Sequence, residues 1–278
     1  MKTEELIKLL NGPEAIAVFG TGFVARMFSA ALAMRGMAGH VNTYAVTEPG
    51  RMRTFEGKPV KAVSELAAGG FSGVILLAVH EALADILMPQ LQELFPGRVV
   101  WIGPNLTELL YGKPVAQKTL SAACLQKAQD PSCYWITVRY AAVRSIAGRR
   151  EEDALAEGLY VKAIGIHCGP STARARYGKL EKLVASFAAV GYDPAHPILI
   201  DENGLIIDGL HRFACARYFG LREIPCEVVP ASPMTDRLLT EKNRLPAPVL
   251  REAGVTEDEM LYLEEAAREL CAGTGKTE

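Results

Sequence analysis

The sequence predicts a mixed α/β protein of two domains, divided at Gly112. In residues 1–112, short apolar runs alternate with amphipathic helical patterns, which is typical of a parallel sheet covered by helices. In residues 197–229, two apolar runs joined by a turn precede a helix and a third apolar run. The chain has 278 residues, 49% of them hydrophobic, which is enough for two separate cores.

The first domain, residues 1–112, is expected to hold four or five parallel strands. Strands are predicted at 15–19, 41–46, 73–78 and 98–102. Helices are predicted at 4–10, at 81–94, at 104–110 and from the first glycine-rich turn to Arg35. This number of strands makes about one mononucleotide-binding half of a dinucleotide-binding fold.

A G-x-G-x-x-A pattern, residues 20–25, connects the first strand to its helix. Gly20 permits a tight turn, Gly22 lets a phosphate approach the backbone, and Ala25 keeps the helix close to the strand. Glu48 follows the second strand, where a ribose-binding acid is expected, although it also lies in an ordinary Thr-Glu-Pro-Gly turn. The predicted cofactor site comprises Gly20, Thr21, Gly22, Phe23, Ala25 and Glu48.

The first domain resembles the small Rossmann-like domains that precede sugar acyltransferases and accompany polysaccharide enzymes. The matching residues are the Gly20–Gly22 loop, the segment Phe-Glu-Gly-Lys-Pro-Val at 55–60 and the strand at 74–78. The resemblance implies a site for NAD or a UDP-sugar. The alternative is a domain of this fold without a ligand, used for dimerisation or docking.

The second domain, residues 113–278, is expected to begin with helical patterns over residues 118–190. An apolar helix at 133–147 contains Arg139 and Arg144, which either pair with buried acids or reach a polar pocket. A charged break follows at 149–153. The segment 169–177 is predicted to be a loop whose Arg174 and Arg176 close over a phosphate or face solvent. Later helices are expected at 234–239 and 246–253, and a last one after a capping box of Thr256 and Glu259.

A strand–turn–strand–helix–strand pattern occupies residues 197–229. Its second strand runs into Asp208-Gly209-Leu210-His211-Arg212, where a helix begins. The first turn of a helix offers free backbone N–H groups, so His211 and Arg212 make this corner a plausible phosphate site. Asp208 either caps the helix or takes part in chemistry.

This pattern, with its Ile-Ile-Asp-Gly-x-His-Arg-x-Ala sequence, resembles the ParB/sulfiredoxin superfamily over residues 179–244. The resemblance implies a ParB/sulfiredoxin-like α+β fold that binds a nucleotide phosphate through Gly209, Leu210, His211 and Arg212. The most similar subgroup is linked to bacterial surface-polysaccharide genes, and in it an Arg-Tyr helix precedes the motif. By that likeness Arg139 would be a second cation beside the phosphate.

At two positions this sequence differs from known members of the superfamily, and these differences narrow the activities that the resemblance implies. Sulfiredoxin-like enzymes carry a catalytic cysteine where this chain has Leu210, so repair of sulfinic acid by that mechanism is not expected. Chromosome-partitioning members have an arginine in place of His211. Kinases of the superfamily need an acidic base, and the candidates by type are Glu202, Asp208 and Glu227.

The function expected from the resemblance is nucleotide binding by a phosphotransferase or nucleotide hydrolase of bacterial surface-polysaccharide metabolism. ATP or CTP with Mg²⁺ would bind the second domain. Arg212 would hold phosphate bidentately, and Asp208, His211 and Glu202 would be the catalytic residues. The alternative is a non-catalytic nucleotide or sugar-nucleotide module that acts as a homodimer or with a glycan enzyme. DNA binding of the ParB type is disfavoured by the net charge of −2.

The remaining composition predicts a cytoplasmic protein. The six cysteines form no C-x-x-C pair and no cluster with histidine, so neither zinc nor disulfides are expected. The acidic start of the chain does not resemble a signal peptide, and no apolar run reaches the length of a membrane span.

Overall fold

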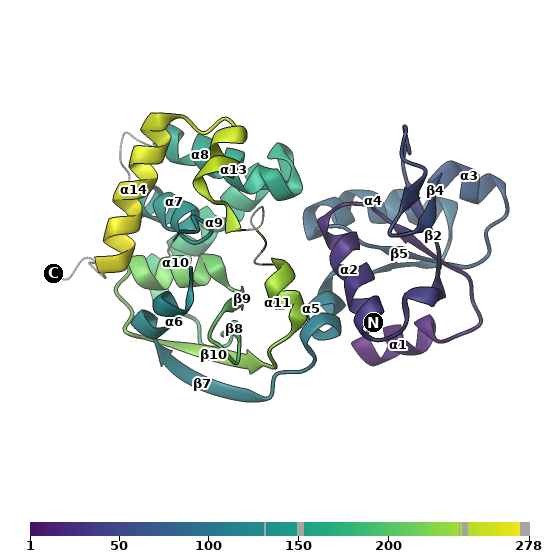
Figure 1. The fold of residues 1–278 in the computed structure, drawn as a ribbon, viewed down its shortest axis with the longest axis horizontal. Helices are drawn as coiled ribbons and strands as arrows, with labels where there is room; N and C mark the ends of the chain where they lie inside the picture. Colours follow the sequence, from purple (N-terminus) through teal and green to yellow (C-terminus); the bar gives the residue numbers. More distant parts are fainter. Residues whose placement is uncertain (131, 149–152, 239, 241–243, 273–278) are drawn as a thin grey trace. The chain divides into compact units, whose positions relative to one another are not determined.

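The computed structural model describes residues 1–130, 132–148, 153–238, 240 and 244–272. The chain is a mixed α/β protein that divides into two compact units, Met1–Gly112 and Lys113–Glu278. Each unit has its own sheet and its own helices (Figure 1).

The first unit contains a six-stranded sheet in the order β3-β4-β2-β1-β5-β6. The strands are β1 (Ile16–Phe19), β2 (Val41–Val46), β3 (Thr54–Phe55), β4 (Lys58–Ala62), β5 (Val74–Leu77) and β6 (Val99–Trp101). All neighbouring pairs are parallel except β3 with β4. The central strands β1 and β5 contain only buried residues, because helices cover both faces of a parallel sheet.

The helices of the first unit are α1 (Thr3–Leu10), α2 (Phe23–Met34), η1 (Ala38–His40), α3 (Val63–Ala68), α4 (Glu81–Leu94) and α5 (Gly103–Tyr111). The predicted strands and helices of this region are confirmed, with ends that differ by one or two residues. The short elements β3, β4 and α3 were not predicted. The strand β4, Lys-Pro-Val-Lys-Ala, has no apolar run, and its parallel pairing with β2 is what makes it a strand.

The second unit contains a four-stranded sheet in the order β7-β10-β8-β9. Its strands are β7 (Ala116–Ser121), β8 (Ile198–Asp201), β9 (Ile206–Asp208) and β10 (Glu223–Val229). The antiparallel β8–β9 hairpin and the returning strand β10 are confirmed. The helix predicted to start near Lys118 is wrong, because this segment is β7, paired antiparallel with β10 from Ser121↔Glu223 to Ala116↔Val228.

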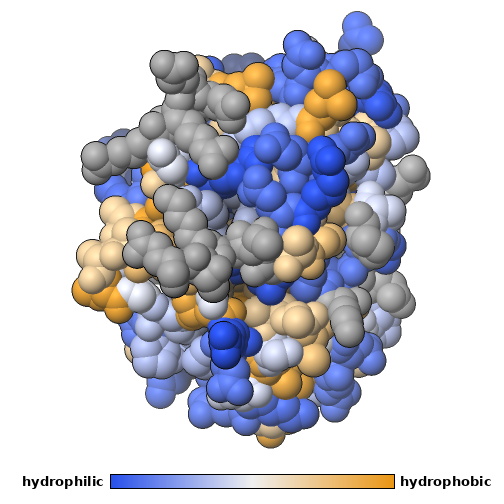
Figure 2. Space-filling model, turned by 90° about the vertical axis from the view of Figure 1, so that its left-hand side faces the viewer, coloured by the Kyte–Doolittle hydropathy of each residue, from blue (hydrophilic) through white to orange (hydrophobic). Residues whose placement is uncertain are grey.

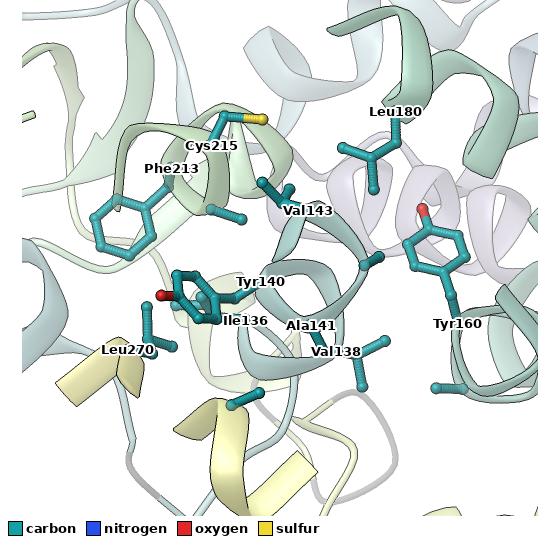
Figure 3. Packing of buried hydrophobic residues seen from close by; sticks show 14 of the residues in the cluster. Ile136, Val138, Tyr140, Ala141, Val143, Tyr160, Leu180, Phe213, Cys215 and Leu270 are labelled. Carbon is teal, nitrogen blue, oxygen red and sulfur yellow. The ribbon is translucent and has the colours of Figure 1, made fainter. Parts of the chain in front are cut away.

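The helices of the second unit are α6 (Ala122–Ala128), α7 (Thr137–Gly148), α8 (Asp153–Cys168), α9 (Pro170–Val190), α10 (Leu210–Tyr218), α11 (Pro233–Leu238), α13 (Ala247–Glu252) and α14 (Glu257–Ala272). The helix α7 is central, and nine consecutive residues from Thr137 to Ser145 are buried. In Figure 3, Tyr140 and Val143 of α7 face side chains of α10 and α14, and Tyr160 of α8 lies on the other side of the helix.

The loop predicted at 169–177 is wrong, because α9 begins at Pro170 and runs through this segment to Val190. Gly169 turns the chain with φ +79°, and Pro170 then occupies the first helical position, which needs no N–H donor. Arg174 and Arg176 therefore lie on a helix. The predicted charged break at 149–153 falls outside the described residues except for Asp153, which begins α8.

The last helix, α14, starts with the predicted capping box. The backbone N–H of Glu259 donates to the Thr256 hydroxyl at 3.3 Å, and the N–H of Thr256 donates to Oε2 of Glu259 at 2.7 Å.

The face in Figure 2 is hydrophilic over most of its area, and hydrophobic residues gather there in separate groups. Within the described residues, no helix combines the length and the apolar character needed to cross a membrane.

Candidate functional site

The first glycine turn joins β1 to α2 and has a strict requirement for Gly20. Gly20 has φ +117°, and a Cβ there would lie 2.8 Å from the Ala78 carbonyl oxygen. Gly22 is different, because it has a negative φ of −83° and open space around the position of a Cβ. The turn thus brings an uncrowded backbone to the start of α2.

This turn lies where the direction of the strand crossovers reverses. From β1 the chain continues to β2 and β4 on one side of the sheet, and β5 and β6 lie on the other side. Ligands of open α/β sheets bind outside the carboxyl ends of the strands at such a point. Ala25 is buried, Thr21 and Phe23 are partly exposed, and Glu48 is exposed beyond the end of β2. The ribose role of Glu48 remains a prediction.

The second glycine turn joins β9 to α10 in the second unit. Gly209 has φ +96° at the N-cap of α10, and a Cβ there would lie 3.1 Å from Cγ1 of Ile198. The alternative that Asp208 caps the helix is wrong, because the cap residue is Gly209 and no side chain accepts a hydrogen bond there. Asp208 is instead exposed and pairs with Arg212 at 3.1 Å.

Arg212 binds its own chain at this corner. Its Nη1 donates to the carbonyl oxygens of His196 at 2.6 Å and Pro197 at 2.8 Å, and its Nη2 donates to Asp208. These bonds fix the first turn of α10 to the segment that enters β8. Arg212 therefore has a positioning role here, and a bidentate hold on phosphate would require it to exchange these partners. Leu210 packs against the hydrophobic core of the unit.

His211 lies between the corner and the helical layer. Its Nε2 lies 2.7 Å from the hydroxyl of Tyr160 on α8, so the two rings hold each other in a fixed orientation. Burial lowers the pKa of His211 well below its usual value, and the positive charges of Arg139, Arg176 and Arg212 lower it further. His211 is therefore neutral at pH 7.

Arg139 on α7 is a buried cation, only 4% exposed. Its guanidinium stacks 4.6 Å above the ring of Trp135, and its Nη1 donates to the Trp135 carbonyl oxygen. Its Nε has no hydrogen-bond partner among the described residues, and no described carboxylate pairs with it. Burial lowers the pKa of Arg139 to about 10, so it keeps its charge at neutral pH.

The pKa of His167 is also affected by the charge of Arg139. Burial, followed by the charges of Arg139 and Arg176, lowers the pKa of His167 to about 4. The His167 ring also contacts the Trp135 ring edge-on, with centroids 5.2 Å apart. We name the set drawn from four helices the Arg139 cluster; its members are Arg139 of α7, Tyr160 and His167 of α8, Arg176 of α9 and His211 of α10.

Arg144, about one and a half turns further along α7, is a second buried arginine, and its charge is paired with carboxylates. It pairs with Glu269 at 2.8 Å and Glu265 at 3.5 Å, and its guanidinium lies 4.4 Å from the ring centre of Tyr262. These acids come from α14. The same helix thus carries one buried arginine with carboxylate partners and one, Arg139, with none described.

The predicted acids are engaged elsewhere. Glu202, in the β8–β9 turn, accepts a hydrogen bond from the N–H of Ala231 at 3.2 Å. Glu227 accepts a hydrogen bond from the side-chain amide of Gln117 on β7 at 3.5 Å. Across the part of the chain that the structure describes, no three His, Cys, Asp or Glu residues gather in a way that would hold a metal ion.

The sequence placed His211 and Arg139 in one candidate site, but it did not indicate Tyr160 or His167 as part of it and put Arg176 in a loop. No motif connects these residues, because they come from different helices and meet only through packing. No model of a known protein family matches the chain, and neither curated proteins nor solved structures give a significant match.

Proposed function

We propose that the second unit binds the phosphate of a nucleotide at the first turn of α10, with the Arg139 cluster as its anion site. The observation that supports this proposal is the buried guanidinium of Arg139, which no described carboxylate neutralises. Keeping an ion out of water costs several kcal/mol unless an opposite charge compensates it. Such a cation, placed beside a hydrogen-bonded histidine, is typical of an anion-binding site.

Each residue then has a distinct role. Arg139 supplies the charge, Tyr160 and His211 supply hydrogen bonds, and the first N–H groups of α10 face the ligand as they do at other helix N-termini. Arg212 positions this turn through its bonds to the residues before β8. The resemblance to the ParB/sulfiredoxin superfamily supports ATP or CTP, with Mg²⁺, as the nucleotide.

The chemistry that fits this site is phosphoryl transfer or nucleotide hydrolysis, in bacterial surface-polysaccharide metabolism as the resemblance implies. A neutral His211 held by Tyr160 is suited to accept a proton from an attacking hydroxyl or water. Asp208 is the exposed acid of the same corner, and release from Arg212 would let it position a metal ion or hydroxyl.

A specific observation favours a second candidate, a nucleotide-binding module without catalysis. Asp208 is paired with Arg212, and Glu202 is bonded to the backbone of Ala231. In this state neither predicted acid has a role in proton transfer. The module would report nucleotide occupancy to a partner glycan enzyme, and the first unit would hold NAD or a UDP-sugar at its Gly20–Gly22 turn.

Calorimetric titration of the full chain with ATP, CTP and ADP, with and without Mg²⁺, tests the binding. Arg139→Met should weaken binding by about 10–150-fold, the value of a hydrogen bond to a charged group. Arg174→Met, which removes an exposed arginine of α9, is the matched control and should bind like the wild type. Equal affinity in the wild type and Arg139→Met would reject the site.

Phosphate release, measured at a saturating nucleotide concentration, distinguishes the enzyme from the non-catalytic module. Turnover that is lost in His211→Ala supports the enzyme. Saturable binding without turnover supports the module.

A further inference from the structure

The depth of the Arg139 cluster restricts how a ligand can reach it. Arg139 is 4% exposed and Tyr160 is 0% exposed, so both lie inside the helical layer of the second unit. Helices α7, α8 and α9 pack against one another, and Ala141, Ala163 and Ala173, one from each helix, are all 0% exposed. A close-packed interior of this kind admits a small group far more readily than a chain that must pass through it.

We infer that the ligand is anchored end-on, by a terminal phosphate that enters the Arg139 cluster, and that phosphodiesters are excluded from it. This inference rests on the proposed function and names the class of ligand. A terminal phosphate has three free oxygens and a single connection, so it can be enclosed on most sides. A diester continues in two directions, and both would have to displace packed helices.

The charges of the cluster favour the same class. Arg139 and Arg176 both act on His211 as positive charges, as does Arg212, whose own charge is offset by the adjacent Asp208. A terminal phosphate is largely dianionic near neutral pH, with a second pKa of about 6, whereas a diester carries a single charge. The buried charge of Arg139, with the positive field of Arg176 acting on the same histidine, therefore favours the terminal group over the diester.

The hydrogen bonds available also fit a terminal group. When Nε2–H of His211 donates to the Tyr160 hydroxyl oxygen, the Tyr160 O–H is left to donate to a ligand, and it comes from a different helix than the Nε of Arg139. The two donors can form hydrogen bonds with different oxygens of one phosphate. A diester has two of its four oxygens blocked by carbon, which leaves fewer acceptors for the same donors.

The inference separates the ligands of the two units. Each phosphate of the interior diphosphate of NAD, and each phosphate of a nucleic-acid backbone, continues in two directions, so neither should enter the Arg139 cluster. Mononucleotides and sugar phosphates with a free terminal phosphate should enter it. If NAD binds the chain, its binding should depend on the Gly20–Gly22 turn and not on Arg139.

The test compares 5′-AMP with 3′,5′-cyclic AMP, which have the same base and sugar and differ in the free phosphate end. Calorimetry on the full chain should give at least tenfold tighter binding of 5′-AMP. Arg139→Met should abolish this preference, and Arg174→Met should keep it. Tyr160→Phe, which keeps the ring and removes only the hydroxyl, should weaken 5′-AMP by about 2–10-fold, the effect of one neutral hydrogen bond.

Three results would overturn the inference, and they differ in what else they reject. Equal binding of 5′-AMP and cyclic AMP, both lost in Arg139→Met, rejects end-on anchoring but keeps the proposed phosphate site. Binding of 5′-AMP that Arg139→Met leaves unchanged rejects the site itself. No binding of either compound or of ATP rejects the proposed function together with the inference. Near-ultraviolet circular dichroism of each variant shows whether its native packing is retained.

Discussion

The two glycine turns of this molecule share a positive φ and have different surroundings. Gly20 follows β1 and Gly209 follows β9, and both take a positive φ, +117° and +96°, before a helix. After Gly20 the chain continues with Thr21 and Gly22 into a helix without an acidic residue in its first turn. After Gly209 it continues with Leu210 and His211, beside arginines from two other helices.

The comparison shows that the glycine turn supplies the approach and the surrounding side chains supply the chemistry. In the first unit the Gly20–Ala25 turn itself has no cationic side chain, so its backbone N–H groups and the helix dipole are what it offers a phosphate, and Arg26 is the next residue along α2. In the second unit Arg139, three helices earlier in the chain, provides a buried charge. The second turn therefore has a buried side-chain charge nearby, and the first turn has none within it.

The largest expected effect comes from filling the first turn. Gly20→Ala should lower the free energy of unfolding of the first unit by about 3 kcal/mol or more, because it combines a positive φ with a Cβ that meets a backbone oxygen. Gly22→Ala is the control, and its cost should stay below about 1 kcal/mol because its backbone is ordinary and the space is open. Urea unfolding monitored by Trp101 fluorescence, in a Trp135→Phe background, measures both. Equal costs would contradict this account of the turn.

Filling the second turn should cost roughly 2–3 kcal/mol. Gly209→Ala meets Ile198 and Arg212 as well as an unfavourable φ. Gly220→Ala is the matched control, because Gly220 has φ +72° with nothing near the position of a Cβ. We expect the control to cost about 1 kcal/mol less, as it lacks the steric term. Trp135 fluorescence in a Trp101→Phe background reports this unit, and a larger cost for Gly220→Ala would refute the prediction.

Removing the positioning arginine should have a slightly smaller effect. Arg212→Met loses two bonds to backbone carbonyls and one to Asp208, and should destabilise the second unit by about 2 kcal/mol. Arg174→Met removes an exposed arginine and should change stability by less than about 0.5 kcal/mol. Denaturant titrations of the two variants provide the comparison. An Arg212→Met protein as stable as the wild type would mean that these bonds do not hold the corner.

The smallest effect is a dependence of stability on pH that belongs to the second unit. His167 and His211 have lowered pKa values in the folded state, so below pH 6.5 the unfolded chain binds protons that the native state does not. The free energy of unfolding should therefore fall as the pH drops from 6.5 toward about 4, the pKa of His167. The slope is at most about 1.4 kcal/mol per pH unit for each histidine.

The variants His167→Asn and His211→Asn isolate this effect from the titration of carboxylates. Each should give a shallower pH dependence than the wild type between pH 6.5 and about 4. Urea unfolding at a series of pH values, followed by Trp135 fluorescence, measures the slopes. Parallel curves for the wild type and both variants would show that the lowered pKa values do not contribute.

The sequence was most informative where apolar runs decide the structure. The buried strands β1 and β5 and the hairpin of β8 and β9 are continuous apolar segments, and each was predicted. The strands β4 and β7 were not, since Lys-Pro-Val-Lys-Ala and Ala-Gln-Lys-Thr-Leu-Ser acquire their structure only by pairing with distant strands.

The candidate site divides in the same way. The corner of Gly209 and His211 is local, so a pattern of a few residues indicated it. The contact between Tyr160 and His211 joins residues 51 positions apart, and it forms because α8 and α10 both pack against α7. The pairing of Arg212 with backbone carbonyls was equally hidden, because a motif gives the residue type and not the partner.

The pairing of β7 with β10 has a consequence for how the chain is made. Ser121 pairs with Glu223, which are 102 residues apart, whereas Ile16 pairs with Val41 only 25 residues away. During synthesis β7 therefore leaves the ribosome long before its partner exists, and loop closure over this length is slow. Its polar composition, with Gln117, Lys118 and Thr119, makes an unpaired strand a poor template for aggregation during that interval.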